Sequence, residues 1–384
     1  MKINQCRICK NVKLKKVGTL GKIAISNFTQ KPQRGTLSPL SLVYCENCTL
    51  LQLAHNPSRH KMYEEHYWYE SRLNPTIVND LKSVAHDALS EVNVKKGDTW
   101  IDIGANDGTL LSFVPKKFVR IGVDPAKNLK KSLSKHTDKI VQNYFDKTKN
   151  LPKAKIITAI AMLYDLPNPH TFVRKLKETL SDDGIIILQL MTLSPMIENN
   201  DVGNICHEHI EYYSYQSLVL LFEKHGLEIY KVKTNSMNGG SYRLFVRHYK
   251  HGSVKFKEKT YTLKDFKNFF MQIEQNKKKF IEFMRICNKN GQKIVAYGAS
   301  TKGNTIIQYY GLDSKSIPAV VDVNPEKIGR FLVKSGIPIV DKVPDCDYLW
   351  ILPYAFIDYF KIKEKAFQKN GGKFVVCTPR VKVL

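Results

Sequence analysis

Two pairs of cysteines near the amino terminus have the spacing of metal ligands. Cys6 and Cys9 form one Cys-x-x-Cys pair. Cys45 and Cys48 form a second, with 35 residues between the pairs. Four thiolates complete the tetrahedral site of structural zinc, whereas disulfides are disfavoured in a cytoplasmic protein. We therefore expect a structural Zn²⁺ in a small, turn-rich domain that unfolds first when the metal is chelated.

A polar loop follows a predicted buried strand at residues 100–103. Its polar residues and glycines are Asp102, Gly104, Asn106, Asp107 and Gly108. The glycines permit turns and the close approach of a ligand, and ligands of open α/β sheets bind at the carboxyl ends of strands. The next predicted strand ends in Asp124, which suits two ribose hydroxyls. The loop is acidic and lacks the Gly-x-Gly-x-x-Gly spacing. A neutral or cationic nucleoside such as S-adenosylmethionine (SAM) therefore fits better than NAD.

A third segment places three titratable side chains in a row: His207, Glu208 and His209. Alternation along an extended chain predicts that the two histidines face one way and the glutamate the other. A histidine metal pair would need further ligands, and histidines without a role in chemistry are an equal alternative. Methyl transfer to oxygen or carbon requires a positioned base, which histidine can supply.

The elements that must position these groups alternate between strands and helices. Helices are predicted at residues 169–180, ended by the Ser-Asp-Asp-Gly segment 181–184, and at 215–225. Strands are predicted at residues 119–124, 156–162, 185–190, 227–231 and 241–246. This alternation predicts a doubly wound, mostly parallel sheet.

A lysine-rich helical stretch at about residues 259–290 precedes a second predicted α/β unit. Its strands are expected at residues 293–297, 318–323, 347–352 and 372–377. A glycine-bounded turn at 298–303 leads into a helix at 304–310. The helix amino terminus, with Ser300, Thr301 and Lys302, offers donors to an anion. The phosphate-loop spacing is absent, so phosphate binding and a structural turn both stay open.

The chain has 384 residues and a formal net charge of +25, which would suit nucleic acid, an anionic membrane or a phosphorylated substrate. Lysines outnumber arginines and are scattered, which disfavours a protein that recognises the bases of a nucleic acid. No apolar run approaches the ~20 residues of a membrane span, and no signal peptide is evident. We expect a cytoplasmic protein that binds neither nucleic acid nor membrane.

The segment 102–108 resembles the first motif of class I SAM-dependent methyltransferases, and Asp124 resembles their ribose-binding acid. This resemblance implies that SAM contacts Asp102, Gly104, Asn106, Asp107, Gly108, Asp124 and Pro125.

The whole chain resembles the sugar C-methyltransferases of deoxysugar pathways, which act on nucleotide-linked keto sugars. The resemblance rests on the cysteine pairs, the SAM loop, the His-Glu-His segment and segments 298–304, 321–329 and 335–339. It implies a zinc-binding domain at 1–60 and a class I SAM methyltransferase domain of Rossmann-like α/β fold, with an aromatic linker, at 61–250. A Rossmann-like α/β domain that binds the nucleotide sugar would follow at 251–384, in a monomeric enzyme.

The same resemblance implies roles for individual residues. His209 would be the general base that forms an enolate, assisted by Glu208 and His207. Residues expected at the substrate are Tyr67, Tyr69, Cys206, Ser300, Thr301, Lys302 and Asn304. The tyrosines have linker packing as an alternative, and Cys206 stands where the family has a tyrosine. Methylation of oxygen or nitrogen on a sugar or small metabolite is therefore the main alternative, ahead of a nucleic-acid methyltransferase or a non-catalytic zinc-containing binding protein.

Overall fold

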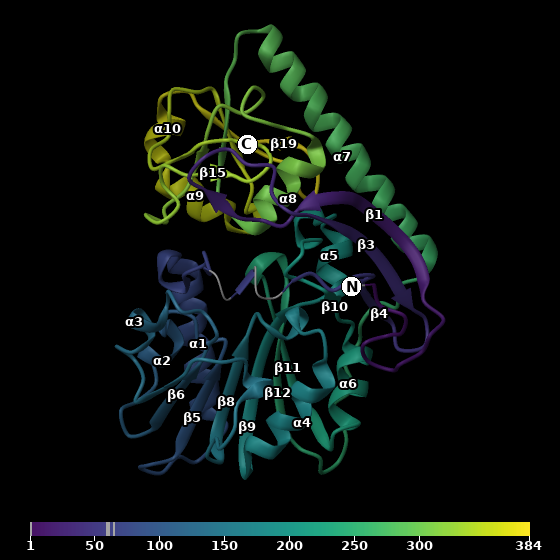
Figure 1. Ribbon diagram of the computed structural model, residues 1–384, viewed down its shortest axis with the longest axis vertical. Coiled ribbons are helices and arrows are strands. Elements are labelled where there is room, and N and C mark those ends of the chain that lie inside the picture. Colours follow the sequence, from purple (N-terminus) through teal and green to yellow (C-terminus); the bar gives the residue numbers. More distant parts are fainter. Residues whose placement is uncertain (1, 59–61, 64–65) are drawn as a thin grey trace.

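The computed structural model describes residues 2–58, 62–63 and 66–384, and Figure 1 shows its arrangement. A seven-stranded sheet forms the lower part in that view. Its strands, in spatial order, are β11 (Leu227–Asn235), β12 (Ser241–His248), β9 (Leu180–Met191), β8 (Ala154–Ile160), β5 (Thr99–Ile103), β6 (Val119–Val123) and β7 (Lys139–Val141). The strands from β9 to β7 are parallel, and β12 is antiparallel to both neighbours. This is the predicted doubly wound sheet.

Helices cover both faces of this sheet. They are α1 (Pro75–Ser90), α2 (Thr109–Ser112), α3 (Lys130–Leu133), α4 (Pro169–Thr179) and α6 (Tyr215–Glu223). Helix α5 (Leu193–Glu198) lies above the sheet in Figure 1, and its buried apolar residues belong to another core. Residues of β5 alternate between two cores: Trp100 packs on the side of α1, and Ile101 on the side of α4 and α6. Every residue of β5 is buried, as expected for a central parallel strand covered on both faces.

The sequence suggested that the Ser-Asp-Asp-Gly segment separates α4 from the following strand, but in the structure it does not. Strand β9 already begins at Leu180, directly after α4. Ala154 pairs with Leu180 and Ile156 with Ile185, so residues 181–184 form an irregularity inside the strand.

The amino-terminal segment forms a four-stranded sheet instead of a small turn-rich unit. Its order is β1 (Lys15–Ala24), β3 (Leu37–Cys45), β4 (Leu50–Leu53) and β10 (Glu211–Tyr212). The last strand comes from a distant part of the chain, shortly after the His-Glu-His segment. This pairing could not be predicted because it joins residues far apart in the chain.

The carboxyl-terminal unit contains a six-stranded sheet with the order β16 (Ile339–Val340), β14 (Val320–Val321), β13 (Ile294–Tyr297), β17 (Tyr348–Ile351), β18 (Lys373–Val376) and β19 (Lys382–Val383). Its helices are α8 (Thr301–Tyr310), α9 (Ile357–Lys363) and α10 (Lys365–Lys369). All neighbours are parallel except β18 and β19. A long helix, α7 (Leu263–Lys289), precedes the unit and begins with a capping box formed by Thr262 and Asp265.

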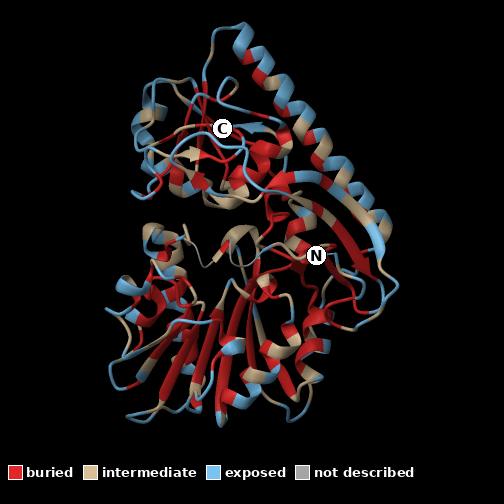
Figure 2. Ribbon diagram, in the orientation of Figure 1, coloured by how far each residue is buried: buried red, intermediate tan, exposed pale blue. Residues whose placement is uncertain are grey.

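The amino-terminal sheet packs against both other units. Helix α7 runs along β1 (Figure 1), so closely that a Cβ atom on Gly18 would lie 2.4 Å from the ring of Phe270. Strand β2 (Phe28–Thr29) pairs with β15 (Phe331–Leu332). One buried core joins β1 and β3 to α7, α8 and β17, while Cys6, Cys45 and Cys48 belong to a core of the seven-stranded sheet. Because of these shared cores, whose residues are buried in Figure 2, we expect the zinc-binding region to unfold together with the other units and not before them.

Among the described residues, none of the helices combines the length and apolar composition that a bilayer crossing requires.

Candidate active site

The four cysteines predicted as metal ligands lie together. The Sγ atoms of Cys6 and Cys48 are 3.4 Å apart, as are those of Cys9 and Cys45. All four sulfur atoms lie within 4.8 Å of one another, and none forms a disulfide. Zinc–thiolate bonds of about 2.3 Å place tetrahedral sulfur atoms about 3.8 Å apart. The four side chains therefore fit a zinc ion, and they form a closed site with no position left for a substrate.

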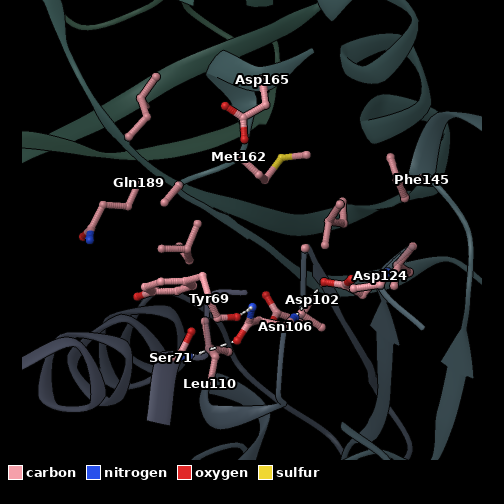
Figure 3. Close-up of a pocket in the computed structure, with 18 of the residues that line it drawn as sticks. Tyr69, Ser71, Asp102, Asn106, Leu110, Asp124, Phe145, Met162, Asp165 and Gln189 are labelled. Carbon is pink, nitrogen blue, oxygen red and sulfur yellow. Dashed lines mark hydrogen bonds between the residues drawn. The ribbon is translucent and has the colours of Figure 1, made fainter. Parts of the chain in front are cut away.

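A pocket opens at the carboxyl ends of β5, β6 and β8 (Figure 3) and has an empty volume of about 1320 Å³, part of it open to solvent. Five of the seven predicted cofactor residues line it: Asp102, Gly104, Asn106, Asp124 and Pro125. The strand order reverses between β8 and β6 around β5. A pocket at such a switch point is where doubly wound sheets bind their ligands.

Two backbone amides hold Asp124 in place. Asn106 N donates to its Oδ2 and Ala126 N to its Oδ1, each at 2.8 Å. Each carboxylate oxygen keeps a further lone pair, so the side chain can accept from two vicinal hydroxyls. Asn106 reaches Asp124 with a φ of 53°, a left-handed conformation that asparagine tolerates. Burial raises the pKa of Asp124.

Asp102 lies deeper, at the end of β5. Its Oδ1 accepts from Thr158 Oγ1 at 2.6 Å, and burial raises its pKa to about 7. Trp100 Nε1 donates to the same hydroxyl at 3.1 Å, which fixes the direction of the Thr158 proton toward the carboxyl.

The side chains of Asn106 and Asp107, in the loop at residues 102–108, bind backbone groups of the aromatic linker. Asn106 Oδ1 accepts from Ser71 N at 3.0 Å, and its Nδ2 donates to Tyr69 O at 2.9 Å (Figure 3). Asp107 Oδ2 accepts from Arg72 N at 2.9 Å, while its Oδ1 caps α2. Asp107 and Gly108 are not among the described residues that line the pocket. A direct contact of Asp107 or Gly108 with SAM therefore stays a prediction.

The aromatic linker faces the pocket from the opposite side. Tyr63, Tyr67 and Tyr69 all line it, and the rings of Tyr63 and Tyr67 lie 5.7 Å apart. Residues 64 and 65 of the linker lie outside the described residues, as does the predicted boundary at 60–61. Trp68 points away: its Nε1 donates to Asn27 Oδ1, and its carbonyl accepts from Asn324 Nδ2 at 2.9 Å. The linker thus contacts all three units.

His209 and His207 do not share a face, so the expectation from strand alternation is wrong. The segment is irregular between a 3-10 turn at Val202–Asn204 and β10. His207 Nε2 donates to Ser38 O at 3.1 Å, toward the amino-terminal sheet, and burial lowers its pKa to about 4. His209 turns toward the interior, where its ring packs edge-on against Tyr164 with centroids 4.6 Å apart.

The tautomer of His209 is set by Asn204. Its Nδ1 lies 2.8 Å from Asn204 Oδ1, an acceptor, so Nδ1 carries the proton and Nε2 the lone pair. Burial, together with the charge of Lys302, lowers the pKa of His209 well below its usual value. The ring is therefore neutral near pH 7 and can accept a proton.

Glu208 lies on the same side as His209 and Cys206. Ligating atoms of these three residues lie within 4.8 Å of one another. Thr301 Oγ1 donates to Glu208 Oε1 at 3.1 Å, and burial raises the Glu208 pKa to about 7. A carboxyl of that pKa can be protonated near neutral pH and donate a hydrogen bond.

Of the four carboxyl-terminal residues expected at the substrate, two face the His-Glu-His segment or the pocket and two do not. Thr301 contacts Glu208, and Lys302 Nζ lies 3.0 Å from Met191 Sδ at the pocket and 4.0 Å from an Asp201 carboxylate oxygen. Ser300 caps α8 by accepting from Gly303 N. Asn304 Nδ2 donates to Ser26 Oγ at 3.1 Å.

Sequence reasoning missed several groups at the site. Lys327, buried, donates to Ala299 O at 2.8 Å and is 3.7 Å from Asp322. Asp80, on α1, lines the pocket and accepts from Gln189 Nε2 at 2.5 Å. Asn74 caps α1 and Pro75 is its first residue, a start signal that could have revealed this helix.

Three family models match the chain in order. They are described as "Putative zinc binding domain" (residues 6–63), "Methyltransferase domain" (79–232) and "C-methyltransferase C-terminal domain" (236–379). A curated protein, "C-methyltransferase NovU" from Streptomyces niveus, is 26% identical over 410 residues, which cover 100% of this chain and 97% of that protein.

Two solved structures are partial matches. A magnesium protoporphyrin IX methyltransferase from Synechocystis is 12% identical with a TM-score of 0.39, over 47% of this chain and 90% of that one. A SAM-dependent methyltransferase from Clostridium acetobutylicum is 12% identical with a TM-score of 0.38, over 47% of this chain and 93% of that one.

Proposed function

We propose that this chain is a SAM-dependent C-methyltransferase with a zinc-binding, a methyltransferase and a carboxyl-terminal domain, and that its acceptor is a carbon beside the keto group of a nucleotide-linked deoxysugar. The observation that carries the proposal is that Glu208 lies close to His209 and accepts a hydrogen bond from Thr301, beside the pocket that Asp124 lines. Tyr164, which contacts His209, directly precedes the pocket residue Asp165.

Carbon methylation requires removal of a proton from a carbon next to a carbonyl. His209 Nε2 carries the lone pair that would take this proton, because Asn204 fixes the opposite nitrogen as the donor. Glu208, with a pKa of about 7, would donate a hydrogen bond to the oxygen on which the enolate charge develops. Bound SAM supplies the electrophilic methyl group, and Asp124 positions the nucleoside that carries it.

Protonation of His209 is unfavourable in the free enzyme, because burial and the charge of Lys302 both disfavour the imidazolium. A substrate diphosphate near Lys302 would neutralise that charge and strengthen the base once the substrate is bound. This coupling supports an anionic nucleotide sugar over an uncharged acceptor. It also gives Lys302 and Thr301 a role at the start of α8, where a helix amino terminus favours anions.

The test is isotope exchange combined with product mass. The enzyme is incubated with SAM and a panel of nucleotide-linked keto sugars, each deuterated beside the ketone. We expect a product heavier by one methyl group and loss of the label to solvent. Product that retains the label would contradict carbon methylation and point to oxygen or nitrogen.

The second candidate, transfer to oxygen or nitrogen on the same scaffold, is favoured by one residue. Cys206 is fully buried beside Glu208 and His209, at the position where the resembling sugar enzymes have a tyrosine. A smaller side chain there changes the space around the acceptor. The isotope experiment decides between the two candidates because neither oxygen nor nitrogen transfer needs the carbon-bound hydrogen to leave.

A further inference from the structure

Cys206, Glu208 and His209 form a donor set that goes beyond acid–base chemistry. A thiol, a carboxylate and an imidazole are the three side-chain types that zinc binds in proteins. Their ligating atoms lie within 4.8 Å of one another. Three protein ligands leave a fourth tetrahedral position open, in contrast to the closed four-cysteine site.

Two of the three side chains are oriented as metal ligands usually are. Ligating histidines donate their other ring N–H to an oxygen, which fixes the tautomer. Here Asn204 Oδ1 accepts from Nδ1 of His209 at 2.8 Å, so Nε2 presents the lone pair. Glu208 is held in turn by the Thr301 hydroxyl at 3.1 Å. Neither supporting group would compete with a metal, because Asn204 acts on the opposite ring nitrogen and Thr301 donates to one carboxylate oxygen only.

The charges around the cluster permit a divalent cation. A Cys206 thiolate and the Glu208 carboxylate together balance two positive charges, and binding releases to solvent the thiol proton and any proton that Glu208 carries. Two lysines are nearby, and a carboxyl group lies close to each. Lys302 Nζ is 4.0 Å from Asp201, and Lys327 Nζ is 3.7 Å from Asp322.

We propose that Cys206, Glu208 and His209 bind a second divalent ion of the zinc class, and that this ion switches the enzyme off. The ion takes the Nε2 lone pair that His209 needs as a base, so metal binding and proton abstraction exclude each other. The inhibitory consequence rests on the proposed function, but the metal site itself does not.

The experiment titrates the full-length, zinc-containing protein with Co²⁺ and follows the near-ultraviolet thiolate-to-cobalt band and the bound metal. The wild-type protein should bind one equivalent of Co²⁺ in addition to the structural zinc, and this Co²⁺ should show the thiolate-to-cobalt band. Cys206→Ser should lose the band and weaken this equivalent by at least about 100-fold, since losing even a supporting group typically costs 10-fold to 100-fold. Thr301→Val should weaken it about 10-fold. Cys346→Ser, at a half-buried thiol of the carboxyl-terminal unit, is the matched control and should behave as wild type.

Either of two results would overturn the site. In the first, wild type binds no Co²⁺ beyond the structural site, an outcome that does not depend on the folding of any variant. In the second, folded Cys206→Ser keeps the extra equivalent and its band. SAM binding by each variant reports its folding, and Cys206→Ala provides a second thiol-free variant.

Turnover then tests the inhibitory consequence separately. Wild-type methyl transfer should fall as one equivalent of Zn²⁺ is added and recover when a weak chelator removes it. Full activity with the second ion bound would refute the inhibition. The Co²⁺ titration contains no sugar substrate, so it can succeed while the carbon-methylation proposal fails, and the isotope experiment can succeed while the metal site fails.

Discussion

Replacing Asp124 tests how this chain holds its cofactor. Both carboxylate oxygens are fixed by backbone amides at 2.8 Å, from Asn106 and Ala126, and the side chain lines the pocket. Two changes separate its roles. Asp124→Ala removes both acceptors for the ribose hydroxyls, whereas Asp124→Asn keeps one oxygen and nearly the same shape.

The expected magnitudes follow from these contacts. A hydrogen bond to a charged group contributes about 1.5–3 kcal/mol, so losing two should weaken SAM binding by about 3–6 kcal/mol. At 1.4 kcal/mol for each factor of ten, this is roughly 100-fold to 10,000-fold for Asp124→Ala and roughly 10-fold to 100-fold for Asp124→Asn. The alanine variant also leaves two loop amides without their acceptor, at about 1–3 kcal/mol each if they stay buried. The asparagine variant leaves only one of these amides without an acceptor, because its NH2 group faces one backbone N–H, and so it disturbs the loop less.

Isothermal titration calorimetry with SAM measures the affinities, and thermal unfolding without SAM reports damage to the loop. Asp138→Asn is a suitable control because it removes an equal charge between β6 and β7, where Asp138 pairs with Arg120. It should bind SAM as wild type does. If Asp124→Ala binds SAM within about threefold of wild type, Asp124 does not hold the ribose and the argument from its geometry is refuted.

Three further outcomes are expected. His209→Asn should retain SAM affinity but lose about 100-fold to 10,000-fold in turnover, and near-normal turnover would exclude His209 as the base. Burial raises the pKa of Glu208 to about 7, so turnover that needs its protonated form should fall as pH rises through 7. Glu208→Gln should lack that decline in a kcat–pH profile, and an unchanged profile would remove Glu208 from this role. Cys6→Ser, or chelation of a zinc that contributes on the order of 10 kcal/mol, should lower the unfolding temperature in one transition, because the zinc region shares cores with both other units. A separate early transition in calorimetry would contradict this.

Features with short-range signals could be predicted from the sequence. Helix α6 and strand β5 lie within two residues of their expected bounds, since period and glycine stops are local properties. The SAM loop and the cysteine pairs were recognisable for the same reason. The class I methyltransferase fold, the SAM cofactor and the zinc-binding domain are confirmed by the topology, the family models and the geometry of the cysteines.

Features that depend on packing between distant segments could not be predicted. The contacts of the Asp107 carboxylate with Arg72 N and Thr109 N were not foreseen, because the first of them depends on how the aromatic linker packs on the loop. The alternation rule failed for His207 because the segment is irregular and β10 joins the amino-terminal sheet immediately after it. Nothing in the local pattern of residues 206–209 indicates either outcome.

The amino-acid sequence shows which chemical groups this protein carries and in what order: four thiols, an acidic nucleoside loop, and a thiol, a carboxyl and imidazoles in one run. The folded arrangement is needed to show which of these groups lie in contact. Glu208 meets Thr301 across 93 residues of chain, and this contact joins the methyl-transfer region to the carboxyl-terminal unit. Spacing fixes local geometry through the backbone, but contacts at such separations depend on how shared cores pack the units together. Packing of that kind buries Glu208 and raises its pKa, whereas the tautomer of His209 and its cluster with Cys206 involve residues within five positions in the chain.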